Sequence, residues 1–133
     1  MEYFLGDWNV ADPSGHEIGT SRCEYEKSGN MIREDWPAVD GLPAQGITFY
    51  DSNERCWKMT WVDSMGTVME SSGQWQGDSL LLNGFLTLRD GDRRKAQTVL
   101  TKQGQNVLVA EMKIEQQGAL VIVSSSRYRR VAK

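Results

Sequence analysis

The stretch that decides the fold is Tyr3-Phe4-Leu5-Gly6-Asp7-Trp8-Asn9-Val10, together with its counterpart Tyr128-Arg129-Arg130 near the other end of the chain. In a small protein built only of strands, a tryptophan at the start and an arginine at the end can meet across one end of a closed barrel. The guanidinium then stacks on the face of the indole. The two segments therefore predict a barrel that is sealed at one end by its own termini.

Turn sequences recur about every 8 to 12 residues, as in antiparallel meanders with short hairpin loops. Between the turns, β-branched and aromatic residues are common, and several segments alternate. Trp57, Met59 and Trp61 face one way, while Lys58 and Thr60 face the other. This alternation predicts strands with one side turned toward a dry interior.

Nine or ten strands are predicted in all. They span residues 3–11, 16–27, 30–36, 44–51, 56–62, 67–75, 79–88, 94–101, 106–115 and 119–130. The absence of a crossover helix excludes a parallel sheet and leaves a sandwich or an up-and-down barrel. Because consecutive short hairpins favour the barrel, the expected fold class is all-β: one domain over 1–133, an antiparallel barrel of roughly eight to ten strands.

Two segments fit this pattern less well. Asp92 could cap a helix that extends to Gln103, although the run from Gln97 to Thr101 fits a strand better. The segment from Pro37 to Pro43 is expected to be a loop near an open rim, because prolines do not fit inside a central strand.

Composition excludes several classes of partner. The chain has 133 residues, 25% of them charged, and a net charge of −3, so nucleic-acid binding is not expected. No apolar run approaches the roughly 20 residues that a membrane helix needs, and the start lacks the features of a secretory signal. We therefore expect a cytoplasmic protein that does not bind membranes, with Cys23 and Cys56 as reduced thiols.

The sequence indicates neither a metal site nor a catalytic nucleophile. One histidine, His16, and two separated cysteines do not make a metal site. Ser124-Ser125-Ser126 lacks a Gly-x-Ser-x-Gly sequence and a paired base, so we interpret it as part of the last strand. Asp90-Gly91-Asp92 is interpreted as a hairpin turn, because it is too short for a calcium loop.

Five tryptophans and six methionines are the unusual part of the composition. If the alternation holds across neighbouring strands, these side chains can line one interior surface that suits flat or apolar small molecules. The candidates are Tyr50, Trp57, Met59, Trp61, Met69 and Trp75. The alternative is that these side chains simply fill the barrel, since an eight-stranded barrel is just wide enough to be plugged by its own residues.

Polar residues among the aromatics complete the candidate site. Arg33, Glu34 and Asp35 precede Trp36, and Glu70 follows Met69; on each strand some of these must face inward. We include Arg33, Trp36 and Glu70 in the candidate site. An inward Arg33 could hold a carboxylate or enolate. Alternatively, it forms an outward pair with a neighbouring carboxylate.

Gly6-Asp7-Trp8 and Tyr128-Arg129-Arg130 together resemble the signature of the lipocalin-like (calycin) barrels, which include fatty-acid-binding proteins. The middle of the chain is similar to a bacterial lipocalin-like family of unassigned function, through Tyr50-Asp51, Trp57 to Trp61 and Asp63 to Gly66. The resemblance implies an internal cavity and no particular reaction. Its Tyr-x-Arg pattern favours Arg130 over Arg129 as the residue stacked on the tryptophan. Haem-binding relatives use a histidine late in the chain, which is lacking here, so no cofactor is expected.

These observations lead to three hypotheses about function. The leading one is that the barrel binds a small hydrophobic or aromatic molecule in its interior. The alternative is an isomerase or cyclase of a biosynthetic pathway, which needs only a shaped chamber and one or two acid–base groups such as Glu70 or Arg33. The third is an interaction protein that forms a homodimer through an unpaired strand edge or exposed aromatics.

Overall fold

A computed structural model describes residues 2–26, 31–36 and 43–131 of the chain. These residues form a short 3-10 helix followed by ten strands. The elements are η1 (Glu2–Phe4), β1 (Gly6–Ala11), β2 (Glu17–Tyr25), β3 (Met31–Trp36), β4 (Ala44–Asp51), β5 (Cys56–Asp63), β6 (Val68–Gln76), β7 (Ser79–Thr87), β8 (Arg93–Gln103), β9 (Val107–Gln116) and β10 (Ala119–Arg130).

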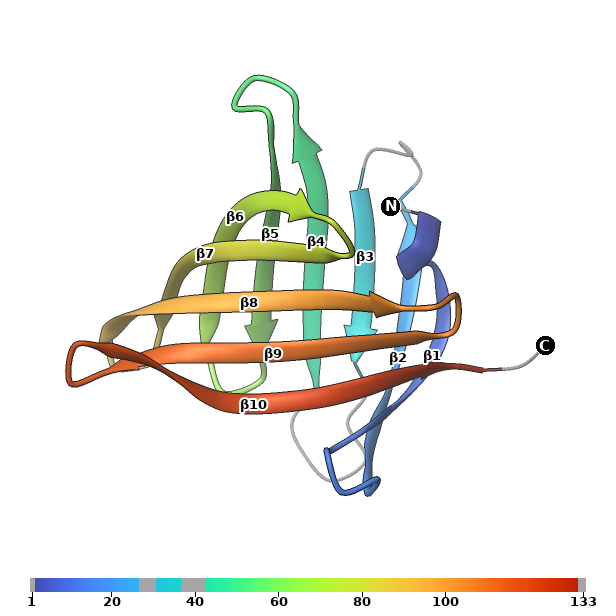
Figure 1. Ribbon diagram of the computed structural model, residues 1–133. Helices are drawn as coiled ribbons and strands as arrows, with labels where there is room; N and C mark the ends of the chain where they lie inside the picture. The colour runs from blue at the N-terminus through green and yellow to red at the C-terminus, as the bar shows by residue number, and fades with distance from the viewer. Residues whose placement is uncertain (1, 27–30, 37–42, 132–133) are drawn as a thin grey trace.

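The ten strands form a single closed barrel in which each strand pairs antiparallel with the next along the chain (Figure 1). The barrel closes where β1 pairs with β10, with Trp8 opposite Arg130 and Ala11 opposite Arg127. The predicted all-β, up-and-down antiparallel barrel is therefore confirmed. No helix among residues 2–26, 31–36 and 43–131 has the length and apolar character needed to cross a membrane.

The beginning of the chain differs from the prediction. Residues 3–11 were expected to be one strand, but β1 begins only at Gly6, and Glu2–Phe4 forms η1. Gly6 has a φ of 117°, a conformation that side chains with a Cβ rarely adopt, so the chain can turn sharply between η1 and β1. The turn lets the aromatic residues of η1 lie across the end of the barrel.

Other predictions agree with the structure or fall outside its described residues. The ambiguous segment from Asp92 to Gln103 contains strand β8, as the run of β-branched residues favoured. The expected turn at 27–30 lies outside the described residues. So does all of the expected loop 37–43 except Pro43.

One end of the barrel is plugged by η1 and clamped by Arg130. The Arg130 guanidinium lies 4.2 Å from the centroid of the Trp8 ring, and it donates hydrogen bonds to the carbonyls of Leu5 (2.6 Å) and Tyr3 (2.8 Å). Trp8 is 1% exposed, and its Nε1 donates to the Phe4 carbonyl at 3.0 Å. The predicted stacking of Arg130 on Trp8 is confirmed.

Strands β6 and β7 run side by side as an antiparallel pair, and both curve strongly (Figure 1). A Cβ at Gly73 would lie 1.6 Å from the Leu81 carbonyl oxygen, and one at Gly84 would lie 1.8 Å from the backbone carbonyl oxygen of Glu70. The two strands can approach this closely only because both positions lack a side chain.

Strand β10 is longer than its partner β1. It pairs with β9 from Ala119 to Arg129 but with β1 only from Arg127 to Arg130. Among the described residues, the edge at 119–126 therefore has no partner strand on its β1 side. Four consecutive apolar side chains on it are 41–53% exposed: Leu120, Val121, Ile122 and Val123.

Candidate ligand-binding cavity

A cavity of about 410 Å³ occupies the interior of the barrel. Phe4 and Trp8 line it at the plugged end, and Trp36, Ala44 and Asp63 line it toward the opposite end. Its middle is bordered mainly by apolar side chains. These are Ile18, Ile32, Met59, Trp61, Met69, Leu86, Leu100, Leu108, Ala110 and Met112.

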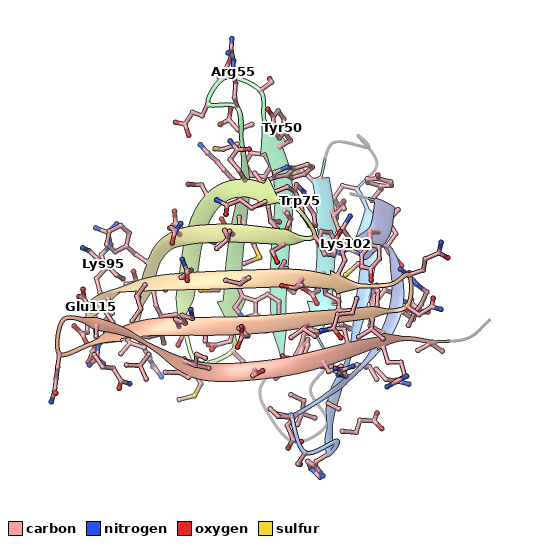
Figure 2. The ribbon with its side chains drawn as sticks, in the orientation of Figure 1. Tyr50, Arg55, Trp75, Lys95, Lys102 and Glu115 are labelled. Carbon is pink, nitrogen blue, oxygen red and sulfur yellow. The ribbon has the colours of Figure 1, made fainter. Side chains whose placement is uncertain are left out.

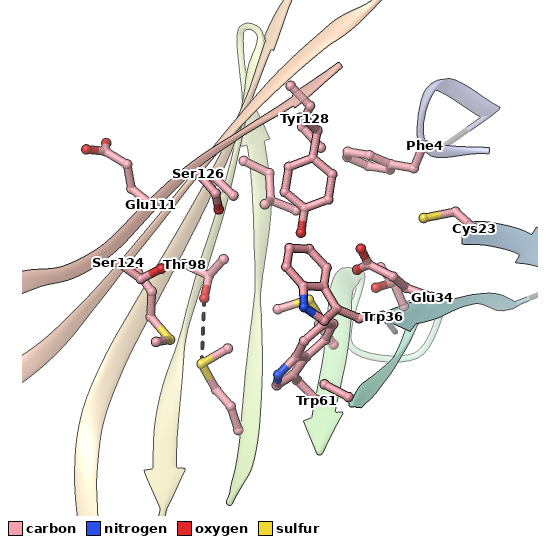
Figure 3. Close-up of a pocket in the computed structure, with 18 of the residues that line it drawn as sticks. Phe4, Cys23, Glu34, Trp36, Trp61, Thr98, Glu111, Ser124, Ser126 and Tyr128 are labelled. Carbon is pink, nitrogen blue, oxygen red and sulfur yellow. Dashed lines mark hydrogen bonds between the residues drawn. The ribbon is translucent and has the colours of Figure 1, made fainter. Parts of the chain in front are cut away.

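An aromatic group forms one wall of the cavity. The rings of Trp36 and Trp61 meet edge to face with centroids 6.1 Å apart, and Trp36 lies 5.6 Å from the ring of Tyr128 (Figure 3). Across the cavity, the Thr98 hydroxyl donates to the Met69 sulfur at 3.6 Å. The three rings come from β3, β5 and β10, so only closure of the barrel brings them together.

Gly46 on β4 makes room for the Trp61 ring. The register places Gly46 between Glu34 on β3 and Trp61 on β5. A Cβ at this position would lie 2.8 Å from a carbon of the Trp61 ring. The missing side chain therefore allows the indole to lie against β4, beside Glu34.

Glu34 is the centre of a small polar cluster in the same wall. Ser21 Oγ donates a hydrogen bond to Glu34 Oε2, and Tyr128 also interacts with this carboxylate through its hydroxyl. Burial raises the pKa of the Glu34 carboxyl above its ordinary value, against the opposing effect of these two hydrogen bonds. Burial removes water from the charged form and so destabilises it relative to the neutral acid.

Two neighbours of Glu34 are held in their neutral forms. The pKa of the Tyr128 phenol is raised well above its usual value, first by burial and then by the charge of Glu34. The pKa of the Cys23 thiol is also raised, for the same two reasons in the same order. Cys23 and Cys56 are both free thiols. A buried thiol with a raised pKa is a poor nucleophile.

The charged side chains of the cavity are all acidic. No lysine, arginine or histidine is among the described residues that line it. Asp63 belongs to the β5–β6 turn, where its Oδ1 accepts the backbone N–H groups of Met65 (2.9 Å) and Thr67 (3.1 Å). Glu111 borders the cavity, but its carboxylate points away from the tryptophans (Figure 3). Of these acids, Glu34 is the one that interacts with Tyr128 of the aromatic wall.

Four of the residues predicted to bind a ligand line this cavity: Trp36, Met59, Trp61 and Met69. They lie on three different strands, β3, β5 and β6. Their alternation with outward residues placed them correctly on the inner face of the barrel.

Three predicted aromatic residues lie near the plugged end and do not line the cavity. Tyr50 and Trp57 meet edge to face with centroids 5.2 Å apart on the β4–β5 hairpin. Trp75 stacks on Phe4 at 5.8 Å, and the Lys102 ammonium lies 4.7 Å from its ring (Figure 2). Phe4 thus separates Trp75 from the interior, an arrangement that depends on η1.

Arg33 and Glu70 were included in the candidate site, and the structure corrects this, because neither faces the interior. Arg33 lies on the outer surface, where it pairs with Glu26 (2.9 Å) and Asp35 (3.2 Å). This is the alternative that the sequence left open. Glu70 is exposed, between Met69 and Ser71, which are buried. The physical reason is the two-residue period of a strand, which sends neighbours such as Met69 and Glu70 to opposite faces.

The sequence prediction missed Glu34, Tyr128, Ser124 and Ser126, all of which line the cavity. Part of the signal was present. With Trp36 inward, the residue two positions earlier, Glu34, must share its face. Likewise Tyr128 shares a face with Arg130. Ser126 and Ser124 precede Tyr128 by two and four residues and share its face as well, since the bulge in β10 lies before them, between Ile122 and Ser124.

The geometry defines a class of protein, a closed antiparallel barrel with an apolar internal cavity. The comparisons add no family: no family model matches the chain, and a search of curated proteins gives no match. In the part of the chain that the structure describes, no group of three or more histidine, cysteine, aspartate or glutamate residues could hold a metal ion.

Proposed function

We propose that this protein is a lipocalin-like barrel that binds a small hydrophobic or aromatic molecule in its internal cavity. The observation that carries the proposal is a cavity of about 410 Å³ lined mainly by aromatic, thioether and aliphatic side chains. Ligand sites in proteins usually measure about 300–1,000 Å³ and have mostly apolar walls with a few polar groups. The cavity has the size and the lining of such a site.

The alternative of a barrel filled by its own side chains is less well supported. Phe4 and Trp8 fill the plugged end, but the space beyond them is bordered in part by short side chains, including Ala44, Ala110 and Ser126. With ten strands, the barrel is wider than one of eight strands that its side chains can fill.

The proposal is tested by titrating apolar fluorescent probes while recording tryptophan emission. Trp36 and Trp61 line the cavity, so a bound probe is expected to quench their emission and to become more fluorescent itself. Ser126→Phe should weaken binding by filling the cavity, whereas Ser125→Phe, at a neighbouring position that does not line it, should not. Equal probe binding by both variants, or no binding to the wild type, would contradict the proposal.

A second candidate is an isomerase or cyclase that uses the cavity as its chamber. The observation that favours it is the Glu34 carboxyl beside the Tyr128 phenol in apolar surroundings, with the pKa of the carboxyl raised. A carboxyl group in such a position can remove a proton from a substrate and return it. An apolar β,γ-unsaturated ketone in D₂O would test it. Deuterium incorporation that Glu34→Gln abolishes supports catalysis, and the same slow exchange with and without protein removes it.

The unpaired edge of β10 favours the formation of a homodimer. Residues 119–126 carry no charge and no proline, two features that often protect an edge strand, although a bulge between Ile122 and Ser124 interrupts the regular pairing with β9. Ile122→Lys should shift a dimer to monomer in sedimentation, whereas Val62→Lys, at an exposed apolar position on the paired strand β5, should not. A wild-type protein that sediments as a monomer at all concentrations would contradict this proposal.

A further inference from the structure

Glu34 is a carboxylic acid in the wall of an apolar cavity, and its protein partners do not supply a positive charge. Ser21 donates a hydrogen bond to it and Tyr128 interacts with it, but both groups are neutral. The adjacent arginine, Arg33, points to the outer surface and is engaged by Glu24, Glu26 and Asp35. A carboxylate removed from water is costly unless it is paired.

The rings near Glu34 are suited to a cation. The rings of Trp36 and Trp61 and the hydroxyl of Tyr128 lie beside its carboxyl group (Figure 3). The faces of aromatic rings attract cations, most strongly in the case of tryptophan and where water is excluded. Gly46 keeps the Trp61 ring beside Glu34. A carboxyl group and aromatic faces in one place make the two kinds of contact that an ammonium group needs.

The remaining polar groups of the cavity do not offset this preference. Asp63 is acidic, and its Oδ1 is engaged in the β5–β6 turn. Thr98 donates to Met69, and Ser124 and Ser126 are neutral. A carboxylate ligand would meet an acid and would find no cationic partner among the described lining residues.

We propose that the cavity selects molecules with a positively charged amine on an apolar body and discriminates against the matching carboxylates. Glu34 contacts the amine, and Trp36 and Trp61 pack around it. The inference rests on the proposed function and names the class of ligand that the same site takes. It reverses the selectivity that an inward Arg33 would have conferred.

Three ligands with the same chain and different head groups test the inference: octylamine, octanol and octanoate. Each is titrated calorimetrically into the purified wild-type protein at neutral pH. Octylamine is expected to bind most tightly, about tenfold or more tighter than octanoate, which corresponds to a single favourable charge contact. Octanol, which has the chain without the charge, should lie between them.

Two matched variants assign the effect to Glu34. Glu34→Gln removes the charge and keeps the shape, so the preference for octylamine over octanoate should disappear. Glu70→Gln removes a carboxylate from the outer surface of β6 and should leave the preference unchanged. Circular dichroism checks that both variants are folded. If Glu34→Gln does not fold, the wild-type comparison of the three head groups still decides the question.

Each outcome has a distinct meaning. If none of the three ligands and none of the apolar probes binds, the proposed function itself fails. If the ligands bind with equal affinity, or if octanoate binds most tightly, the cavity binds apolar molecules but the inference about charge is wrong. A preference for octylamine that persists in Glu34→Gln would also overturn it, because Glu34 would then not be the group that recognises the amine.

Discussion

The plugged end and the cavity wall of this barrel differ in how completely their charged side chain is paired. At the plugged end, the guanidinium of Arg130 lies on the Trp8 ring and donates to backbone carbonyls of Tyr3, Leu5 and Gln105. In the cavity wall, the carboxyl of Glu34 has hydroxyl partners but no cation. One charged group is fully matched within the chain, and the other is not.

The difference separates the part of the barrel that stabilises it from the part suited to bind. Buried charges that are paired and hydrogen-bonded hold elements in place, and a clamp of this kind ties residues at both ends of the chain together. An acid without a counter-charge next to an empty space costs stability, and a ligand can remove that cost. The predictions below change one region at a time.

The largest expected effect comes from Trp8→Ala at the plugged end. Trp8 is 1% exposed and packs against Tyr3, Tyr128 and Arg130. Its removal should lower the free energy of unfolding by about 3–5 kcal/mol, measured by urea denaturation. Trp61→Ala, in the partly exposed cavity wall, should cost only about 1–2 kcal/mol. Equal losses would show that the two regions contribute alike to stability.

Arg130→Lys is a smaller change at the plugged end, because it keeps the positive charge and removes only the guanidinium. The ammonium keeps the charge but cannot reach several carbonyls at once in the fixed geometry of a guanidinium. We expect a loss of about 2 kcal/mol in the free energy of unfolding, in line with hydrogen bonds to charged groups. Arg129→Lys, on an exposed neighbour, is the control and should change stability little. If the Arg130→Lys variant has the same free energy of unfolding as the wild type, the guanidinium does not stabilise the plugged end through its several hydrogen bonds.

Gly46→Ala acts on the cavity wall. The added methyl group would lie 2.8 Å from the Trp61 ring, which must move toward the cavity. We expect a stability loss of about 1 kcal/mol from this overpacking, and weaker probe binding. The double variant Gly46→Ala, Trp61→Phe should recover part of the stability, because the smaller ring leaves space for the methyl group. No recovery would mean that the contact with Trp61 is not the cause.

Glu34→Gln should change the pH dependence of stability more than stability itself. Burial raises the pKa of Glu34 in the folded protein. Between the ordinary pKa of a glutamate and this raised value, the folded state keeps a proton that the unfolded state has released. The wild type therefore loses stability as pH rises through this window. Above the raised pKa, Glu34 is ionised in both the folded and the unfolded state and adds no further pH dependence.

Denaturant midpoints across this pH range, compared between the wild type and Glu34→Gln, measure the effect. The groups that act on Glu34 are Ser21 and Cys23 on β2, the adjacent Asp35 on β3, and Tyr128 on β10, and they are the same in both proteins. Asp12 and Asp51, with lowered pKa values, give the opposite slope and are also shared. A stability difference between the two proteins that does not vary with pH would contradict a raised pKa at Glu34.

Much of this architecture follows from the sequence alone. The regular turns and the alternation of residues such as Trp57, Met59 and Trp61 placed all ten strands to within a few residues. The paired end motifs predicted the stacking of Arg130 on Trp8. Such features follow from local chemistry, because turn residues and a two-residue period are properties of neighbouring positions in the chain.

Only the tertiary structure decided which of the inward residues share the cavity. Trp75 and Trp57 have the same apolar character as Trp61, yet η1 places Phe4 against Trp75, and the β4–β5 hairpin carries Trp57 beyond the space. Glu34 meets Ser21 and Tyr128 only because β3 pairs with β2 and the barrel closes through β10. Contacts between strands distant in sequence depend on register and closure, which no local pattern encodes.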